Sequence, residues 1–211
     1  MAHYLSAEPV LKLARAADWH QLALLRHAMQ MNTETLSKQT SKFLSLVLRD
    51  EPGKIGLILD GQGWANVDEL LQKLAAHGHA LDRGGLQHIV ASCNKQRFAL
   101  SDDGQRIRAN QGHSVAVDLG LLPVAPPQWL YHGTVSRFVG SIREQGLRAG
   151  ERHHVHLSLD RETAHQVGAR RGAPVILSVH AGRMHADGHV FHRSANGVWL
   201  TDHVPPQYIA D

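Results

Sequence analysis

The chain of 211 residues is poor in the features that mark disulfide-stabilised, secreted and membrane-spanning proteins. Its one cysteine, Cys93, cannot form an internal disulfide, so a reducing cytoplasm is the expected compartment. Cys93 falls in an apolar helical stripe, which favours a core residue over a nucleophile. No stretch approaches the ~18 uninterrupted apolar residues of a membrane-spanning helix, and the start of the chain lacks the basic segment of a secretory signal.

The sequence also lacks a strong net charge, since the formal value is only +3. A value this small hardly suggests nucleic acid by itself. The basic residues of the C-terminal half are nevertheless mostly arginine, whose planar fork suits phosphate. Histidine is plentiful instead, with 17 residues. The composition therefore leaves a phosphorylated partner open.

Residues 40–108 follow the order of a winged helix. Apolar periodicity predicts three helices, the second opened by a capping box of Asn66 and Glu69 and the third beginning near Asp82. Two short strands, Arg97–Leu100 and Arg106–Arg108, then flank a turn. Three helices followed by a hairpin are typical of nucleic-acid-binding modules, although the outline alone is weak evidence.

The pattern changes after a proline-containing linker at Leu121–Pro127. Two helices are expected, one ending at Gly146 and one running from about Asp160 to Ala169. No βαβ repeat and no glycine-rich phosphate loop are present, so a dinucleotide would be bound without a Rossmann fold. The class is therefore expected to be α+β. The predicted strands are Trp129–His132, His154–Ser158, Val175–His180, Val190–His192 and Val198–Thr201.

Four short segments carry residues suited to chemistry. In their order and spacing they resemble the NAD-dependent RNA 2′-phosphotransferase family, whose members remove a splicing-derived 2′-phosphate from tRNA. The resemblance covers all of the chain except an N-terminal extension. The segments are Leu46–Pro52 with Gly56–Asp60; Asn94–Phe98; Tyr131–Thr134 with Gly146, Leu147, Arg152 and His154–Ser158; and Ser194–Thr201 with Val204–Pro206.

The resemblance implies two lobes with an active site in the cleft between them. Residues 36–118 would form a winged-helix-like RNA-binding lobe, 119–128 a Pro-rich linker, and 129–211 an ADP-ribosyltransferase-like lobe that binds NAD⁺. Residues 1–35 would be a helical extension of unknown role. The expected partners are RNA bearing a 2′-phosphate and NAD⁺ as co-substrate, and a monomer is favoured.

The implied reaction has two steps. The RNA 2′-phosphate attacks the anomeric carbon of the nicotinamide riboside and expels nicotinamide. The ribose 2″-hydroxyl then attacks the same phosphorus, which frees 2′-hydroxyl RNA and ADP-ribose 1″,2″-cyclic phosphate. Both steps require a fixed phosphate and stabilisation of its charge, which arginine can supply.

The family uses an arginine from each of three motifs, and the matching positions are Arg49, Arg97 and Arg152. A solvated surface charge is the ordinary interpretation of any one of them. The shared family pattern reverses that preference. Because the three come from both predicted lobes, we expect a phosphate site in the cleft.

Two strand motifs would bind the NAD⁺. Gly133 permits close backbone approach to the carboxamide, and His132 and Ser158 can donate to or accept from ribose and amide groups. His154 and His156 share a face of one strand, with His156 the better placed. The predicted NAD⁺-binding residues are His132, Gly133, Thr134, His156, Leu157, Ser158 and Val198.

The match breaks after Arg49, where the family has histidine and this chain has Asp50. The family histidine touches the 2′-phosphate and serves the second step. A carboxylate ~4 Å from a phosphate is repelled by roughly 4 kcal/mol at an effective dielectric of ~20. Three explanations stay open: a natural enzyme that stops after ADP-ribosylating the phosphate, an engineered substitution that traps an intermediate, or a tolerated change.

Several alternatives accompany this prediction. The chain could be an ADP-ribosyltransferase that modifies a nucleic-acid terminal phosphate or a protein, or a winged-helix nucleic-acid binder that senses NAD⁺ without catalysis. The histidines could hold a metal, but they lack cysteine or carboxylate partners at ligand spacing, so none is expected. Trp64, Trp129 and Trp199 could stack on bases, but core packing is favoured for each.

Overall fold

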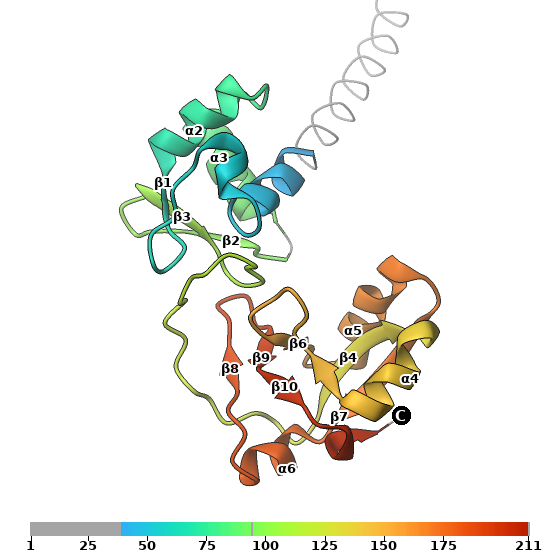
Figure 1. Ribbon diagram of the computed structural model, residues 1–211. Coiled ribbons are helices and arrows are strands. Elements are labelled where there is room, and N and C mark those ends of the chain that lie inside the picture. Colours follow the sequence, from blue (N-terminus) through green and yellow to red (C-terminus); the bar gives the residue numbers. More distant parts are fainter. Residues whose placement is uncertain (1–38, 94, 211) are drawn as a thin grey trace, which may run out of the picture. The chain divides into compact units, whose positions relative to one another are not determined.

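The computed structural model describes residues 39–93 and 95–210 (Figure 1). The predicted helical extension and Asn94 lie outside the described residues. Helices and short strands are mixed along the chain, which confirms the α+β class. The winged-helix and ADP-ribosyltransferase-like descriptions of the two halves stay predictions.

The N-terminal half has the predicted order of helices followed by a hairpin. Asn66 Oδ1 accepts a hydrogen bond from Glu69 N at 3.0 Å, and Asp82 Oδ1 accepts one from Gly85 N at 2.7 Å. These caps satisfy backbone donors that a helix start leaves unpaired, and both predicted starts are confirmed. The elements are a helix at residues 39–47, η1 (Pro52–Ile55), β1 (Ala65–Asn66), α2 (Val67–Ala76), α3 (Arg83–Ser92), β2 (Phe98–Leu100) and β3 (Arg106–Ala109).

The three N-terminal strands form an antiparallel sheet of order β1-β3-β2. Ile107 of β3 is completely buried. The N-terminal half also contains fully buried leucines in its helices and in the turn after residue 47: Leu44, Leu48, Leu70, Leu74 and Leu86.

The C-terminal half is rich in short strands. Its sheets have the orders β11-β7-β4, β6-β9-β8 and β10-β5, all antiparallel. The elements are β4 (Leu130–Val135), α4 (Ser136–Gln145), β5 (Leu147–Arg148), β6 (Val155–Leu157), α5 (Arg161–Gly168), η2 (Ala169–Arg171), β7 (Pro174–Val179), α6 (Ala181–Ala186), β8 (His192–Arg193), β9 (Trp199–Thr201), β10 (His203–Val204), η3 (Pro206–Tyr208) and β11 (Ile209–Ala210).

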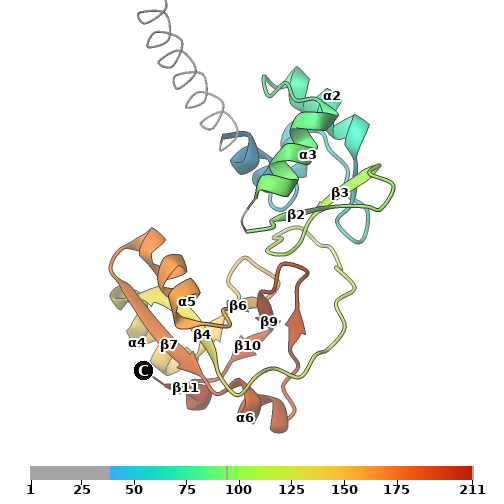
Figure 2. The same ribbon diagram turned by 180° about the vertical axis from the view of Figure 1, so that it is seen from behind.

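Helix α5 packs closely against β4 and β7 (Figure 2). Glycines make the approach possible: a Cβ atom on Gly133 would lie 1.8 Å from the carbonyl oxygen of Ala164, and one on Gly168 would lie 2.8 Å from that of Thr134. Both distances are far below van der Waals contact. The packing of α5 therefore explains why position 133 is a glycine. The sequence prediction gave another reason, the close approach of the carboxamide of NAD⁺.

The tryptophans do not share one environment. Trp199 is buried in the C-terminal core, as predicted. Trp129 is 36% exposed and its ring lies 3.7 Å from that of His180, so the core prediction for it is wrong. Trp64 is half-buried beneath the guanidinium group of Arg108, 4.5 Å from the ring centre.

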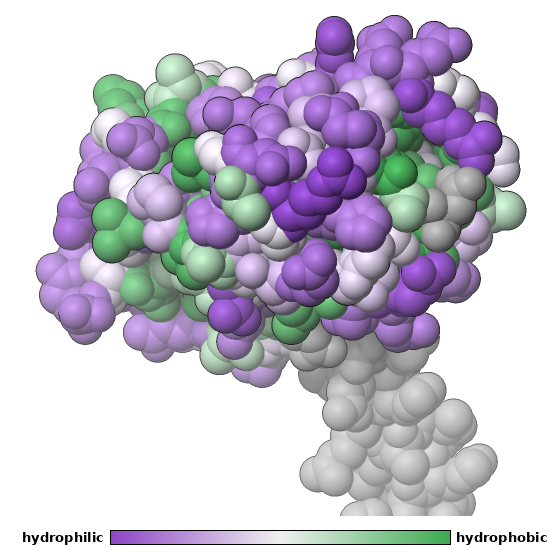
Figure 3. All heavy atoms as spheres, turned by 90° about the horizontal axis from the view of Figure 1, so that it is seen from below, coloured by the Kyte–Doolittle hydropathy of each residue, from purple (hydrophilic) through white to green (hydrophobic). Residues whose placement is uncertain are grey.

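Hydrophilic residues cover most of the face seen in Figure 3, and hydrophobic ones gather there in small patches. Among the described residues, no helix combines the length and apolar character required to cross a membrane.

Candidate functional site

Arg49 and Arg152 converge on one glycine. Gly112 has a φ of +83°, and a Cβ atom on it would lie 3.7 Å from Nη1 of Arg49 and 3.4 Å from Nη1 of Arg152. Arg49 follows the helix at residues 39–47, whereas Arg152 precedes β6. Residues 44–211 form one compact unit, so the two predicted motifs meet within it. Arg97, just before β2, contributes a further positive charge that acts on Arg49.

We define the arginine cluster as Arg49, Arg97 and Arg152. Its positive charge is not fully balanced by carboxylates. Burial, followed by the positive charges of Arg152 and Arg97, lowers the pKa of Arg49 to about 10. The Nε and Nη2 groups of Arg49 are buried without a hydrogen-bond partner among the described residues. An unpaired buried donor and crowded like charges are both unfavourable, and a bound anion would relieve both.

Asp50 lies inside this cluster. Its Oδ1 is 3.1 Å from Nη1 of Arg152 and accepts a hydrogen bond of 2.9 Å from Oγ of Ser114. The ion pair has poor hydrogen-bond geometry, because Nη1 of Arg152 makes no aligned bond. One carboxylate thus partly neutralises a site that three arginines make positive.

The loop Gly112–Ser114 organises this site, and it was not predicted. The backbone N–H of Ser114 donates to the carbonyl oxygen of Arg49 at 3.1 Å, and that of Val115 does so at 3.3 Å. The loop therefore fixes the backbone of Arg49 and, through Ser114 Oγ, the side chain of Asp50. The only sequence signal was a Gly-His-Ser run directly after the hairpin.

The two predicted NAD⁺-binding strands lie side by side. Tyr131 and Ser158 exchange backbone hydrogen bonds of 2.9 and 2.7 Å, which join β4 to the end of β6. The Nδ1 atom of His132 lies 3.1 Å from the carbonyl oxygen of His156. Burial lowers the pKa of His132, so its imidazole is neutral at pH 7. His132, His156 and Ser158 are thus neighbours, and their binding of NAD⁺ stays a prediction.

His156 connects these strands with the arginine cluster. A Cβ atom on Gly112 would lie 3.7 Å from its Nε2. Burial, then the charge of Arg152, lowers the pKa of His156 to about 4. The side chain is therefore a neutral donor and acceptor at pH 7.

The other predicted residues have packing or turn contacts. Leu157 is buried in the core, and Thr134 is buried opposite Val175 of β7. Val198 closes the turn before β9, because its N–H donates to Ser194 Oγ and its carbonyl oxygen accepts from Ser194 N. The structure gives none of these three a side chain directed at the arginine cluster.

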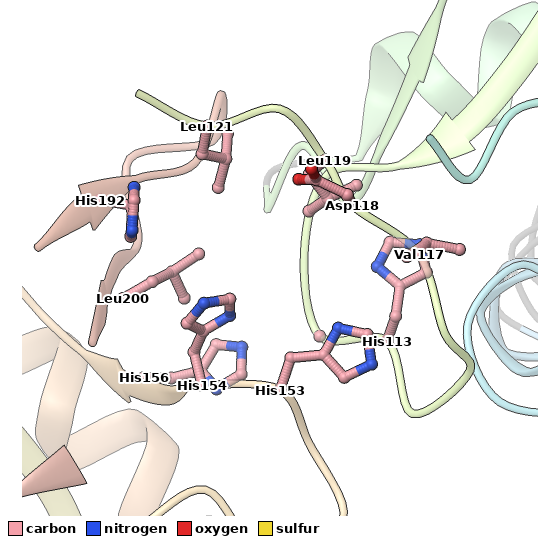
Figure 4. A pocket seen from close by; sticks show the side chains of 11 residues that line it. His113, Val117, Asp118, Leu119, Leu121, His153, His154, His156, His192 and Leu200 are labelled. Atoms are coloured by element: carbon pink, nitrogen blue, oxygen red, sulfur yellow. The ribbon is translucent and has the colours of Figure 1, made fainter. Parts of the chain in front are cut away.

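A cavity of about 90 Å³ adjoins His156 (Figure 4). His113 and His192 stand at opposite ends of it, with His153, His154 and His156 between them. Only 2% of His113 is exposed, and its Nε2 has no hydrogen-bond partner among the described residues. Burial, then the charge of Arg49, lowers the pKa of His113 to about 4. Among the described residues, no three His, Cys, Asp or Glu side chains are grouped to hold a metal ion.

Cys93 is not the core residue that its helical stripe predicts. It ends α3, is half-buried, and accepts a hydrogen bond from Nη1 of Arg97 at 3.5 Å. Burial disfavours its thiolate, but backbone hydrogen bonds from Arg97 and Lys95, together with the charge and side-chain hydrogen bond of Arg97, outweigh burial and lower the pKa of Cys93. The thiol thus helps to hold one member of the arginine cluster.

The comparisons with known proteins point to one family. The model described as RNA 2′-phosphotransferase, Tpt1 / KptA family, matches residues 35–203. A protein of Streptomyces griseus named "Probable RNA 2′-phosphotransferase" is 55% identical over 183 residues, which are 83% of this chain and 97% of the relative. Relatives with the same name from Agrobacterium fabrum (59% identical, 82% of this chain and 94% of the relative) and Pseudomonas aeruginosa (56%, 86% and 100%) agree. The chain therefore belongs to the RNA 2′-phosphotransferase family.

Proposed function

We propose that this chain transfers a 2′-phosphate from RNA to NAD⁺ and so returns the RNA to a 2′-hydroxyl. Its relatives are named RNA 2′-phosphotransferases, which supports the transferred group and the substrate class. The observation that carries the proposal is the meeting of Arg49, Arg152 and His156 around Gly112. A positive cluster next to a polar strand pair suits a phosphate held beside a nucleotide.

The arginine cluster is suited to the RNA phosphate. The unpaired N–H groups of Arg49 can donate to phosphate oxygens, and a guanidinium group stays charged throughout the reaction. A phosphate dianion would also relieve the repulsion between Arg49, Arg97 and Arg152. We assign these three residues to positioning the phosphate and stabilising its charge.

The β4–β6 pair is suited to the nicotinamide riboside. His132, His156 and Ser158 offer donors and acceptors to hydroxyl and amide groups, and both imidazoles are neutral at pH 7. The oxocarbenium-like centre that forms on the ribose carries positive charge. Neutral histidines on this side avoid repelling that charge, while the arginines hold the attacking phosphate.

The reaction then has two balanced steps. A phosphate oxygen forms a bond to the anomeric carbon as the glycosidic C–N bond breaks and its electrons return to nicotinamide. The 2″-hydroxyl of the ADP-ribose next loses its proton as its oxygen attacks the phosphorus, the bond to the RNA 2′-oxygen breaks, and that oxygen takes up a proton, so protons balance. Products are 2′-hydroxyl RNA, nicotinamide and ADP-ribose 1″,2″-cyclic phosphate.

The test is incubation of the protein with NAD⁺ and an RNA labelled at an internal 2′-phosphate. We expect release of nicotinamide and transfer of the label. Arg152→Gln should lower the first-step rate by at least about 100-fold, because one phosphate donor is lost. Arg148→Gln, an exposed arginine on β5, is the matched control and should react normally. Absence of nicotinamide release from the unaltered protein would contradict catalysis and favour a non-catalytic NAD⁺-sensing binder.

A second candidate function is ADP-ribosyl transfer that stops at the RNA-phosphate conjugate. The ion pair of Asp50 with Arg152 favours it. The first step needs the phosphate to remain nucleophilic, whereas the second builds extra negative charge on a crowded phosphorus. A carboxylate in the cluster opposes the second step more than the first, since it reduces the positive charge available there.

Asp50→His and Asp50→Asn separate the two candidates. Each removes the carboxylate, so each should speed the second step relative to the first and reduce the RNA–phosphate–ADP-ribose conjugate that accumulates. Asp118→Asn, another carboxylate near the histidine-lined cavity, is the control. Equal acceleration of both steps would show that Asp50 acts on binding alone.

A further inference from the structure

The carboxylate of Asp50 is an anion inside the site that we assign to the phosphate. Its Oδ1 lies 3.1 Å from Nη1 of Arg152 and accepts a hydrogen bond of 2.9 Å from Oγ of Ser114. Its negative charge also acts on Arg49. Carboxylate and phosphate oxygens both bind guanidinium groups through charge-assisted hydrogen bonds. Asp50 therefore contacts one of the groups that would hold the RNA phosphate.

Within residues 39–93 and 95–210, hydrogen bonds and ion pairs engage only one oxygen of the Asp50 carboxylate. Both contacts are made by Oδ1, so Oδ2 keeps its lone pairs. The side chain is 28% exposed, so a molecule in the site can reach it. The backbone N–H of Asp50 donates to the carbonyl oxygen of Leu46 at 2.8 Å, which holds the residue at the end of the first helix. A fixed carboxylate with one free oxygen can serve as a nucleophile.

The strands that we assign to NAD⁺ lie next to this carboxylate. Nη1 of Arg152, which contacts Asp50, and Nε2 of His156 both face Gly112, where a Cβ atom would lie 3.4 Å and 3.7 Å from them. His156 belongs to the strand pair that would hold the nicotinamide riboside. In the proposed reaction, a phosphate bound to Arg152 reaches the anomeric carbon. Asp50 is held by the same guanidinium group, so we expect its carboxylate to have the same access to that carbon.

We propose that Asp50 is itself an ADP-ribose acceptor, so that the protein modifies its own chain when NAD⁺ is bound without RNA. The inference rests on the proposed function, because that function places NAD⁺ beside the arginine cluster. Oδ2 of Asp50 forms a bond to the anomeric carbon as the glycosidic C–N bond breaks and its electron pair leaves with nicotinamide. The pyridinium becomes neutral nicotinamide, the carboxylate becomes an uncharged ester, and no proton is transferred.

The chemistry of the site favours this step. In retaining glycosidases an aspartate or glutamate carboxylate captures an oxocarbenium-like carbon and forms a covalent ester. The negative charge of Asp50 attracts the positive charge that forms on the ribose. Burial lowers the pKa of His132 and of His156, so neither imidazole repels that charge at pH 7. The family has a histidine in place of Asp50, and an imidazole cannot form an ester.

The RNA phosphate and Asp50 compete for the same carbon. A phosphate monoester carries more negative charge than a carboxylate at pH 7, so it binds the arginine cluster more strongly. A bound 2′-phosphate therefore displaces Asp50 from Arg152 and becomes the acceptor. Self-modification is expected when NAD⁺ is present and phosphorylated RNA is scarce.

The test is incubation of the full chain with NAD⁺ alone, followed by acid quenching and mass spectrometry of tryptic peptides. Cleavage after Arg49 and Lys54 releases the peptide Asp50–Lys54, which we expect to carry one ADP-ribosyl group. Neutral hydroxylamine should remove this group, because it cleaves esters. Asp50→Asn should lower the labelled fraction at least about tenfold, because the nucleophile is lost.

Glu51→Gln is the matched control. Glu51 is the neighbouring carboxylate in the same peptide, and it is exposed and paired with Lys54 at 2.9 Å. This variant should be labelled as fully as the unaltered protein. A saturating RNA with an internal 2′-phosphate should suppress the labelling of Asp50, whereas the same RNA with a free 2′-hydroxyl should not.

The outcomes separate this inference from the proposed function. Labelling that persists in Asp50→Asn, or that hydroxylamine does not remove, would place the group on another side chain and overturn the inference. An unlabelled protein that still transfers the RNA 2′-phosphate to NAD⁺ would contradict self-modification alone. Labelling at Asp50 without transfer from RNA would support self-modification and contradict the proposed function. If the protein is neither labelled nor active on RNA, both fail.

Discussion

At the scale of single residues, Arg49 is held in a position that is unfavourable for folding. Two of its N–H groups are buried without a partner among the residues that the structure describes, and Arg97 and Arg152 repel its charge. The unpaired donors alone would cost about 1–3 kcal/mol. We propose that this cost is kept for binding, because a bound anion would supply the hydrogen-bond partners that the fold does not.

Replacing Arg49 with methionine should therefore separate stability from activity. The variant removes the unpaired donors and the repulsion, and its side chain can fill the same space. We expect the free energy of unfolding to rise by about 1 kcal/mol while first-step activity falls at least about 100-fold. Urea denaturation and nicotinamide release measure the two quantities.

Inorganic phosphate provides the control for Arg49. It should raise the melting temperature of the unaltered protein, because an anion that binds only the folded state stabilises it, and it should leave Arg49→Met unchanged. A variant that loses both stability and activity would show that Arg49 is primarily structural.

At the scale of elements, the packing of α5 on β4 sets the position of a strand that we propose binds NAD⁺. Gly133 belongs to the sequence run His-Gly-Thr, and its missing side chain is what lets the helix approach. The helix in turn holds the strand that carries His132. Gly133 thus affects the position of His132 indirectly, through the packing of α5 on β4.

Gly133→Ala should force β4 and α5 apart, since the new methyl group would meet the backbone of Ala164. We expect a loss of about 3 kcal/mol or more in unfolding free energy. Gly140→Ala is the matched control, because Gly140 lies on α4 with nothing within 4 Å of the added atom. That change should stabilise α4 by about 0.5–1 kcal/mol. Similar unfolding curves for the two variants would contradict the packing argument.

The sequence predicted the helices and strands better than it predicted the site at which Arg49, Arg152 and Gly112 meet. Caps at Asn66 and Asp82 and the apolar periodicity are local signals, so the helices and most strands could be placed within a few residues. The meeting of Arg49 with Arg152 came from the family resemblance, since no local pattern encodes a contact across a hundred residues. Gly112 was missed because its turn has no periodicity and its importance is purely spatial.

The misjudged side chains share one physical reason. Cys93 and Trp129 were assigned to the core from their apolar neighbours in the sequence. Burial depends on which elements pack together, and both residues lie at the ends of elements where packing stops.

At the scale of the whole molecule, buried neutral histidines connect stability to pH. His113 has a pKa of about 4, well below the ordinary value of 6.5. The unfolded chain therefore binds a proton that the folded chain does not between these values. Stability from His113 is fully present above pH 6.5 and is lost as the pH falls toward 4.

The unaltered protein should lose about 2 to 3 kcal/mol of unfolding free energy through His113 between pH 7 and pH 4.5. The glutamine of His113→Gln cannot titrate. The loss of unfolding free energy in this variant should therefore be smaller than in the unaltered protein by about 2 to 3 kcal/mol. Urea denaturation of both proteins at the two pH values provides the measurement. Parallel losses in the two proteins would mean that other groups control acid unfolding.

The segment between the two halves is attached at both of its ends. Asp118 N donates to the carbonyl oxygen of Gly61 at 2.8 Å, and Val124 N donates to that of Phe191 at 2.8 Å. The few residues between these anchors can change length without breaking either of these backbone hydrogen bonds. A chain cut or lengthened there would keep both anchors, whereas one altered at Gly112–Ser114 would lose the support of Arg49 and Asp50. The short stretch 119–122 is thus the natural place to divide this protein into two pieces that can be recombined.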